Sequence, residues 1–328
     1  MKEAVAKAHA NIALVKYWGK RDDRLILPMN GSISMTVDQF YVTTSVTFDQ
    51  RLAADSLIIN GSQAARDDQA RASEFLNLVR KWAKTDERAV IRSVNSVPVA
   101  SGLASSSAAY AALTKAAALA LGMPWSSAEL SRLARHGSGS ASRSIYGGFV
   151  EWLRGSRDDG SDSYAVPLAP PDYWDLAMVI ARVDEGKKAI SSRDGMRRVV
   201  ETSLFYSGWL ATVDSDLATV REAIKRRDFS ALGRTAEMNA LKMHATTLGA
   251  NPPFIYWSGA TVEVIRRVQR LREEGIEAYV TIDAGPHAAV LCRPDDAGAV
   301  RAALAEVQGV KEIIAAGPGP GARAVPAL

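Results

Sequence analysis

The stretch 95–122 constrains the fold most, because its pattern is a strand end, a glycine-containing loop and a long alanine-rich helix. The segment "NSVPVASGLASSSAAYAALTKAAALALG" has Gly102 in the loop, serines at 105–107 and Gly122 as a helix stop. The first amides of such a helix have no intrahelical acceptor, and its dipole is positive at that end. Phosphate oxygens are natural acceptors there, and serine hydroxyls add donors and potential Mg²⁺ ligands. Simple capping by serine is the alternative, although three serines exceed what one cap needs.

Other phosphate-binding signatures do not occur in the sequence. It contains no G-x-x-x-x-G-K-[ST] loop and no set of protein-kinase motifs. If the chain binds ATP, we therefore expect it to do so through the 95–122 segment.

The order of hydrophobic patterns predicts an α+β protein with two lobes. Strand patterns precede helical patterns in the first half, and the second half runs strand, helices, two strands, helix and strand. The proline-rich "PLAPPDYWD" at 167–175 predicts a boundary that divides the chain into 1–174 and 175–328. Strands are expected at 41–48, 56–61, 89–94, 176–183, 278–283, 288–292 and 310–316, helices at 72–84, 105–121, 194–225, 229–247, 261–274 and 298–307, and an irregular tail at 317–328.

Composition narrows the classes of partner and of site. The 328 residues carry a formal charge of +4 and the basic residues are spread along the chain, so nucleic-acid binding is not favoured. The single cysteine, Cys292, excludes an intramolecular disulfide and favours a reducing, cytoplasmic setting. The four histidines show no metal-ligand spacing, and we interpret His244 as structural. No stretch has the length of a signal-peptide core or a membrane span.

Three further segments combine glycine or serine with cations, which are residue types that bind anionic groups. Residues 136–152, "HGSGSASRSIYGGFVEW", place the planar donor fork of Arg143 among small residues. For each segment the alternative is a flexible loop or a set of solvated lysines. Together the segments predict a ligand with several negative charges, and a nucleotide as well. The other two segments are 11–34, with Asn11, Lys16, Tyr17 and Lys20, and 184–196, with Lys187, Lys188, Ser191, Ser192 and Arg193.

One carboxylate stands apart from these cationic segments. In "TIDAGPHAAVLC", Asp283 ends an apolar strand pattern, and Gly285 and Pro286 then predict a turn. A site crowded with positive charge needs a carboxylate only for a specific role. We therefore expect Asp283 to face the same cleft as the cations.

These residues resemble the diphosphomevalonate decarboxylase family of the GHMP kinase superfamily. The segment "PVASGLASSSAA" is similar to the phosphate loop of that superfamily. The resemblance runs in family order from about residue 8 to residue 292. The remaining segments that carry it are "ANIALVKYWGKRDDRLILPMNGSIS", "GSGSASRSIYGGFVEW", "ISSRDGM", "NALKMHATTLGANPPFIYW" and "TIDAGPHAAVLC".

The resemblance implies a fold, a reaction and partners. The implied N-terminal lobe is like ribosomal protein S5 domain 2 and the implied C-terminal lobe is ferredoxin-like, within a homodimer. The implied reaction phosphorylates the 3-hydroxyl of mevalonate 5-diphosphate with ATP and Mg²⁺. Loss of that phosphate with CO₂ then gives isopentenyl diphosphate, a precursor of isoprenoids. Neither nucleic acid nor a membrane is an implied partner.

The resemblance also implies roles for individual residues. Asp283 corresponds to the proposed general base, with Arg143 and Lys16 as the other catalytic residues. The resemblance implies no resident metal site, because Mg²⁺ binds together with ATP. It implies that Ser106 or Ser107 contacts this Mg²⁺. Substrate binding is implied for Tyr17, Lys20, Ser138, Gly139, Ser140, Arg143, Ser192, Arg193 and Met196. ATP binding is implied for Asn95, Ser96, Gly102, Leu103, Ala104, Ser105, Ser106, Ser107, Lys187 and Lys188.

Some positions depart from the family pattern and leave alternatives open. His287 stands where the family usually has asparagine, Ser142 where it usually has cysteine, and Ser107 where it commonly has alanine. His287 adjoins the Asp283 turn, so the alternatives include a decarboxylase or 3-kinase that acts on mevalonate 5-phosphate or on mevalonate. Another small-molecule GHMP kinase fits "KYWGK" and "DAGP" less well. A ligand sensor without activity predicts loss of the carboxylate, which Asp283 retains.

Overall fold

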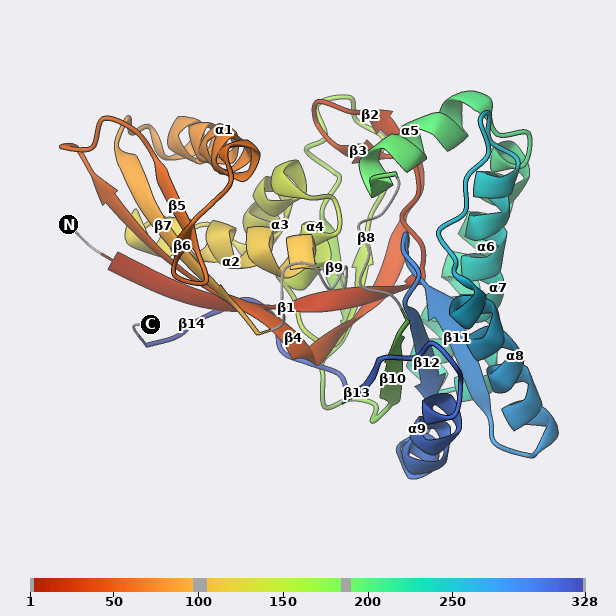
Figure 1. The fold of residues 1–328 in the computed structure, drawn as a ribbon. Helices are drawn as coiled ribbons and strands as arrows, with labels where there is room; N and C mark the ends of the chain where they lie inside the picture. The colour runs from red at the N-terminus through yellow and green to blue at the C-terminus, as the bar shows by residue number, and fades with distance from the viewer. Residues whose placement is uncertain (1–2, 97–104, 184–189, 327–328) are drawn as a thin grey trace.

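The structure is a computed structural model that describes residues 3–96, 105–183 and 190–326. The chain folds into two α+β lobes that lie side by side (Figure 1). This arrangement confirms the two-lobed α+β class predicted from the sequence.

The N-terminal lobe is built on a mixed sheet whose longest strands are β1 (Glu3–Val15) and β4 (Ser32–Asp49), paired antiparallel. The described strands follow the order β14-β1-β4-β7-β5-β6, while β8 pairs with β4 and with β9. Only β5 and β7 pair in parallel among these strands. The remaining strands are β5 (Ser56–Ile59), β6 (Ser62–Gln63), β7 (Arg88–Asn95), β8 (Phe149–Trp152), β9 (Ala165–Ala169) and β14 (Arg323–Ala324).

Helices cover one face of this sheet (Figure 1). The alanine-rich α2 (Ser105–Ala120) packs directly on β1 and β4, because small side chains allow a helix to approach a sheet closely. It ends as predicted near Gly122, whose φ of +65° suits glycine. The other helices on this face are α1 (Arg66–Ala83), α3 (Ser127–Gly137) and the short α4 (Ala141–Ser144).

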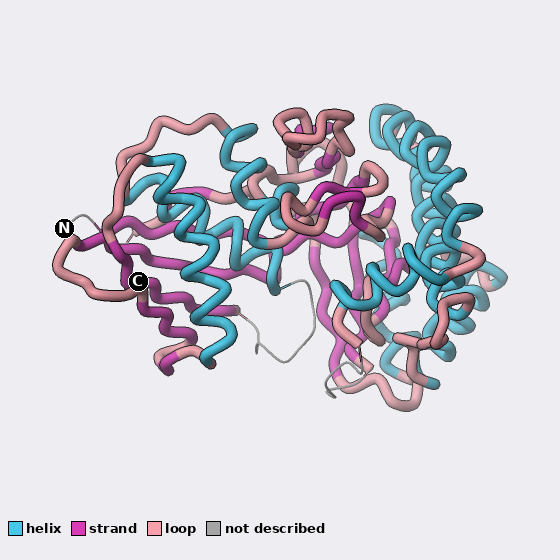
Figure 2. The backbone as a smooth tube through the Cα atoms, turned by 90° about the horizontal axis from the view of Figure 1, so that it is seen from above, coloured by secondary structure: helices cyan, strands magenta, loops and turns pink. Residues whose placement is uncertain are grey.

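The C-terminal lobe has an antiparallel sheet in the order β11-β12-β10-β13. A second apolar core lies between this sheet and helices α8 and α9. Figure 2 shows helices gathered at the end of the molecule away from the N-terminus, and among them α6 and α7 pack against each other and against β1. The elements are β10 (Ala177–Arg182), α5 (Ser192–Thr202), α6 (Tyr206–Arg226), α7 (Phe229–Leu248), α8 (Gly259–Glu273), β11 (Ala278–Ile282), β12 (Ala288–Cys292), the 3₁₀ turn η2 (Pro294–Asp296), α9 (Ala297–Ala305) and β13 (Glu312–Ala316).

The structure differs from the sequence predictions at several places, among them the helix α3 and the strand β9, which were not predicted. The single helix expected at 194–225 is two helices, because the chain turns at Ser203, the C-cap of α5. The tail expected to be irregular forms β14, which pairs with Ala6 and Lys7 of β1. The strand β1 was not predicted, because its near-continuous apolar pattern overlaps the polar residues of the segment 11–34. The chain then forms the small hairpin β2 (Lys20–Asp22) and β3 (Leu27–Pro28).

Candidate active site

A cavity of about 580 Å³ lies between the lobes, and most of the predicted site residues line it. Residues from β1 and the segment after it meet residues from α2, α4, α5 and the loop after β11. Its lining comprises Asn11, Ala13, Lys16, Tyr17, Trp18, Lys20, Ile26, Arg71, Ser106, Tyr110, Gly137, Ser138, Gly139, Ser140, Arg143, Ser191, Ser192, Arg193, Asp194, Met196, Met243, Asp283 and Ala284.

Asp283 and Lys16 form an ion pair at one wall of the cavity. Nζ of Lys16 lies 2.7 Å from Oδ1 of Asp283 and donates a second hydrogen bond, of 2.8 Å, to the carbonyl oxygen of Ala13. The lysine side chain is 2% exposed and the aspartate side chain 49% exposed. Burial lowers the pKa of Lys16 below its usual 10.5, and the Asp283 carboxylate opposes that shift. The carboxylate is therefore held in place yet open to a ligand.

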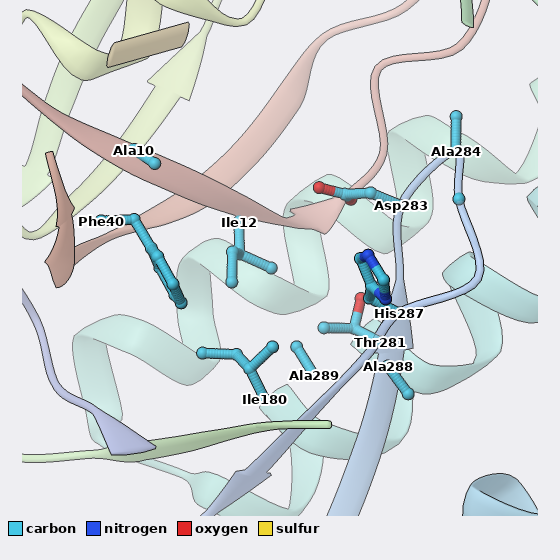
Figure 3. Close-up of a pocket in the computed structure, with 11 residues that line it drawn as sticks. Ala10, Ile12, Phe40, Ile180, Thr281, Asp283, Ala284, His287, Ala288 and Ala289 are labelled. Carbon is cyan, nitrogen blue, oxygen red and sulfur yellow. The ribbon is translucent and has the colours of Figure 1, made fainter. Parts of the chain in front are cut away.

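The turn after β11 presents Asp283 as the sequence predicted. The N–H of Gly285 donates a 2.7 Å hydrogen bond to the carbonyl oxygen of Asp283, which closes a tight turn before β12. Figure 3 shows the Asp283 carboxylate directed toward the red-tinted ribbon of the N-terminal lobe. A smaller pocket of about 40 Å³, lined mainly by apolar side chains such as Ile12, Phe40 and Ile180, lies beside it. That pocket is too small for a substrate with two phosphates, so the larger cavity is the candidate site.

Arg143 is a buried cation on α4 that only neutral groups hold. Its Nε donates to Oδ1 of Asn11 at 3.1 Å and to Oγ of Ser34 at 2.9 Å, and Nη1 donates to Oγ of Ser32. Within the described residues, Nη2 has no hydrogen-bond partner. Burial lowers the pKa of Arg143 to about 10, and the charge of Asp283 acts in the opposite direction. The guanidinium remains charged at neutral pH and lines the cavity.

The glycine-serine loop 137–140 forms the wall next to Arg143. A Cβ on Gly139 would lie 2.8 Å from Cε1 of Tyr17, and one on Gly137 would lie 2.0 Å from Cδ1 of Tyr110. These glycines therefore make room for cavity-lining tyrosines, whereas the sequence suggested close approach to a ligand. The hydroxyl of Tyr17 is buried and has no partner among the described residues, and burial raises its pKa.

Hydroxyls of that loop face the start of α2. Oγ of Ser138 lies 3.3 Å from Oγ of Ser140 and 3.3 Å from Oγ of Ser106. Ser106 is exposed and lines the cavity, whereas Ser107 is fully buried and does not. Ser105 begins α2, but its side chain lies outside the described part. Ser106 is thus the described serine of α2 that lines the cavity.

The first turn of α5 forms the opposite wall. Ser191 is the N-cap, and Ser192, Arg193 and Met196 line the cavity. Arg193 is exposed, without a hydrogen-bond partner in the described residues. Lys20 lines the cavity from the β2–β3 hairpin, with its Nζ 2.6 Å from Oδ1 of Asp23.

Some predicted nucleotide residues lie away from the cavity or outside the described chain. Asn95 and Ser96 lie at the end of β7, where Ser96 Oγ accepts from the N–H of Tyr41 at 2.9 Å. Neither residue lines the cavity. Gly102, Leu103, Ala104, Lys187 and Lys188 lie outside the described residues, so their roles stay predictions.

Several cavity residues were not assigned a role from the sequence. Arg71 projects from α1 and Tyr110 from α2, and both positions depend on how the helices pack on the sheet. The sequence analysis named Asn11 only as a neighbour of the lysines. Its amide oxygen accepts from Nε of Arg143, and its Nδ2 donates a 3.0 Å hydrogen bond to the carbonyl oxygen of Ser140, so it connects Arg143 to the loop. An asparagine inside an apolar strand pattern was the signal that could have identified it.

The two histidines nearest the ion pair have structural contacts. Nε2 of His244 lies 3.3 Å from the carbonyl oxygen of Ile282, and burial lowers the pKa of His244 to about 4. It is therefore neutral at physiological pH and fits the structural interpretation. Nδ1 of His287 accepts a 3.3 Å hydrogen bond from the N–H of Val183 at the end of β10. His287 thus joins the Asp283 turn to the neighbouring strand.

The residues that line the cavity suit a charged ligand. Across 3–96, 105–183 and 190–326, the His, Cys, Asp and Glu side chains form no group of three or more that could hold a metal ion. In the same ranges, no helix has both the length and the apolar character needed to cross a bilayer. The cations and hydroxyls of the cavity can bind anionic groups, and its two exposed carboxylates, Asp194 and Asp283, can accept a proton.

Comparison with known proteins identifies the family. A sequence model described as "Diphosphomevalonate decarboxylase-like N-terminal domain" matches residues 8–165, and one described as "Mevalonate 5-diphosphate decarboxylase C-terminal domain" matches residues 178–317. The diphosphomevalonate decarboxylase of Ganoderma lucidum is 38% identical over 310 residues, covering 88% of this chain and 78% of that protein. The Homo sapiens enzyme of the same name is 36% identical over 307 residues, covering 88% and 76%.

Solved structures agree over almost the whole chain. Mevalonate diphosphate decarboxylase from Staphylococcus aureus superposes with a TM-score of 0.95 at 44% identity, covering 99% of this chain and 98% of that one. A structure of MDDEF in complex with MVAPP, AMPPCP and magnesium gives a TM-score of 0.93 at 46% identity, covering 99% of both chains. These neighbours confirm the GHMP-kinase-type fold that the resemblance implied. The chain belongs to the diphosphomevalonate decarboxylase family.

Proposed function

We propose that this protein is an ATP-dependent decarboxylase that converts mevalonate 5-diphosphate into isopentenyl diphosphate, CO₂, ADP and phosphate. The observation that carries the proposal is the convergence of the Lys16–Asp283 pair, Arg143 and Arg193 on one cavity of about 580 Å³. The carboxylate is exposed on the same surface as cations that suit phosphate and carboxylate groups. Family membership and the ligands of the solved neighbours agree with this arrangement.

Asp283 is the group best placed to accept the proton of the 3-hydroxyl. As the hydroxyl oxygen bonds to the γ-phosphorus of ATP, the bond from that phosphorus to ADP breaks and the proton passes to the carboxylate. Lys16 directs Oδ1 of Asp283 through a 2.7 Å hydrogen bond. An ammonium has three N–H donors, and Asp283 and Ala13 accept two of them. The third is available to the substrate.

The second step breaks two bonds of the phosphorylated substrate. The C3–O bond breaks as phosphate leaves, and the bond to the carboxyl carbon breaks to release CO₂, with its electron pair forming the new double bond. Positive charge develops on C3 during this step, and the exposed carboxylate of Asp283, paired with Lys16, can stabilise it. Arg143 can hold the carboxyl group until it leaves as CO₂.

The described residues also fit ATP phosphates. Ser106 in the first turn of α2 adds an exposed hydroxyl to the cavity, and the N-terminal end of a helix suits phosphate oxygens. Magnesium bound to ATP phosphates supplies charge neutralisation in such transfers. We propose Ser106 as its nearest described serine, because Ser107 is buried away from the cavity.

The experiment that tests this function measures ADP and CO₂ together. The protein is incubated with Mg·ATP and, in separate reactions, with mevalonate, its 5-phosphate and its 5-diphosphate. We expect ADP and CO₂ in equal amounts with the 5-diphosphate. ADP without CO₂ would contradict decarboxylation, and CO₂ only with the 5-phosphate would change the substrate.

We further propose a cytoplasmic homodimer. The single cysteine, Cys292, is buried and free, as suits a reducing compartment. Leu204, Phe205 and Leu248 are 85%, 56% and 51% exposed, and Phe205 lies against Gly249, next to Leu248. A second copy would remove this apolar cluster from water. Sedimentation of the wild type and of Leu204→Glu tests the proposal, and an unchanged dimer in the variant would place the interface elsewhere.

A further inference from the structure

Lys16 lies one residue beyond β1, and both lobes hold its main chain. Its carbonyl oxygen accepts a 2.7 Å hydrogen bond from Nδ2 of Asn30, in the N-terminal lobe. Its N–H donates a 2.8 Å hydrogen bond to Oδ1 of Asn239, on α7 of the C-terminal lobe. The side chain of Asn239 is fully buried. Because a buried N–H needs an acceptor, Asn239 fixes the chain direction where Lys16 leaves the sheet.

Asp216 on α6 determines which end of the Asn239 amide faces Lys16. Nδ2 of Asn239 donates a 2.7 Å hydrogen bond to Oδ2 of Asp216. Nζ of Lys242 donates to the same oxygen at 2.7 Å and to Oγ1 of Thr212 at 2.8 Å. A carboxylate only accepts hydrogen bonds, so the amide must turn its NH₂ group to Asp216 and its oxygen to Lys16. The reverse orientation would place two donors against each other at Lys16.

The main chain at Lys16 sets where its ammonium lies. The ammonium is placed between the carbonyl oxygen of Ala13 and Oδ1 of Asp283, with little freedom at 2.8 and 2.7 Å. Oγ1 of Thr281, two residues before Asp283, donates to the same Ala13 oxygen at 3.2 Å. A displacement of about 1 Å at a reacting group can lower a rate by about 100-fold. Movement of the main chain at Lys16 would therefore displace its ammonium and, with it, the Asp283 carboxylate that accepts the proton.

We propose that Asn239, oriented by Asp216, is a positioning residue that holds Lys16 so that its ammonium orders the Asp283 carboxylate for proton transfer. In the described part of the chain, neither Asn239 nor Asp216 lines the cavity, so both act through Lys16. The inference rests on the proposed decarboxylase function. It adds that helices α6 and α7 of the C-terminal lobe determine the geometry of a residue that follows a strand of the N-terminal lobe.

The first test is Asn239→Leu, which keeps the side-chain size and removes both polar groups. We expect kcat to fall at least about tenfold, while the dissociation constant of an ATP analogue stays within about twofold. The basic limb of the pH profile of kcat should also move to lower pH, because a loosened Asp283 stabilises the Lys16 ammonium less. Thr246→Val is the matched control. It removes the 3.1 Å acceptor of the Trp18 indole from the same helix and the same segment, and its kcat should stay within about threefold.

The second test exchanges the two side chains. Asn239→Asp alone places two carboxylates together and should lower kcat. With Asp216→Asn added, the new carboxylate at position 239 accepts from the Lys16 N–H and from the amide NH₂ at position 216, which takes the place of Oδ2, while Lys242 keeps Oγ1 of Thr212 as an acceptor. We expect the double variant to recover at least half of the lost activity on a logarithmic scale. This pair carries the test if Asn239→Leu does not fold.

Three results would overturn the inference: an Asn239→Leu kcat within twofold of wild type, an equal loss in Thr246→Val, or no recovery in the double variant. A general packing role predicts that equal loss together with an unmoved basic limb. Failure of the proposed function is distinguishable, because the wild type would then release no CO₂ from mevalonate 5-diphosphate. The same variants would in that case be compared on whichever substrate the wild type phosphorylates.

Discussion

Lys16 and Arg143 are buried cations at the same cavity, yet different kinds of group hold them. Lys16 is paired with the carboxylate of Asp283 at 2.7 Å. Arg143 is held by the amide of Asn11 and the hydroxyls of Ser32 and Ser34, none of which carries charge. Burying a cation without a directly bonded counter-charge is costly, and the Asp283 carboxylate offsets only part of that cost at Arg143, so an anionic ligand there would reduce it further. At Lys16, the directly bonded carboxylate of Asp283 already offsets part of that cost.

This difference predicts different roles for the two cations. An unneutralised guanidinium with a free Nη2 edge among the described residues suits the binding of a carboxylate or phosphate of the substrate. A neutralised ammonium contributes less to net binding, but it fixes the direction of its partner carboxylate. The comparison therefore predicts that changes at Arg143 act mainly on substrate binding and that changes at the Lys16–Asp283 pair act mainly on turnover.

The largest expected effect follows removal of the carboxylate in Asp283→Asn. Because general-base catalysis contributes about 10²–10⁴-fold, we expect kcat to fall by about 10³-fold while substrate binding persists. Single-turnover assays and calorimetric binding of mevalonate 5-diphosphate measure the two quantities. Glu222→Gln is the control, since it removes the exposed partner of Arg226 and should not alter kcat. Turnover near wild type in Asp283→Asn would reject Asp283 as the base.

Arg143→Ala should give the second-largest effect. Loss of a charge-assisted contact of about 3 kcal/mol corresponds to about 100-fold in kcat/KM for the substrate. The KM for ATP should change by less than about threefold, because the guanidinium faces the substrate side. Arg143→Lys, which keeps the charge without the planar fork, should lie between wild type and alanine. A selective loss of ATP affinity would indicate that Arg143 contacts ATP and not the substrate.

The third prediction concerns the pH dependence of Lys16. Its folded pKa lies below 10.5 because of burial, so the ammonium deprotonates earlier than in the unfolded chain. Activity should fall about tenfold per pH unit above that folded pKa, since the neutral amine no longer orders Asp283. In the same window the unfolded state binds more protons, so the contribution of Lys16 to stability rises with pH. Activity and stability from this group therefore change in opposite directions.

Two measurements distinguish this fall of activity at alkaline pH from unfolding. The thermal unfolding midpoint should not fall in parallel with kcat as the pH rises toward about 10, the value near which ordinary tyrosines ionise. Lys16→Arg keeps a charged group throughout and should lack the limb, whatever its absolute rate. Persistence of the same limb in Lys16→Arg would assign it to another group.

Sequence reasoning located the parts of the site that depend on local pattern. The strand end at Asp283, the glycine-serine loop before Arg143 and the serines at the start of α2 are readable because turns, small residues and helix starts have local signatures. Each of these segments contributes residues to the cavity, although Ser107 is buried and does not line it. The two-lobed α+β class followed from the order of the patterns.

The rest depends on contacts between segments far apart in the chain. Arg71 reaches the cavity only through the packing of α1, and Asn239 meets Lys16 across 223 sequence positions. The chain turn at Ser203 and the pairing of β14 with β1 likewise depend on tertiary contacts. Local propensity carries no information about such pairs, which is why the groups that hold the two cations were not predicted.

The smallest expected effect tests how firmly neutral groups hold Arg143. Ser34→Ala removes one of two acceptors of Arg143 Nε and leaves Asn11 Oδ1 at 3.1 Å. The loss of about 1 kcal/mol corresponds to about fivefold in kcat/KM for the substrate, with kcat nearly unchanged. Ser45→Ala is the matched control on the same strand, β4, because the buried hydroxyl of Ser45 has no partner among the described residues. Equal kcat/KM values in the two variants would show that Asn11 and Ser32 alone suffice to hold the guanidinium. The uncharged groups around Arg143 would then act less cooperatively than their geometry indicates.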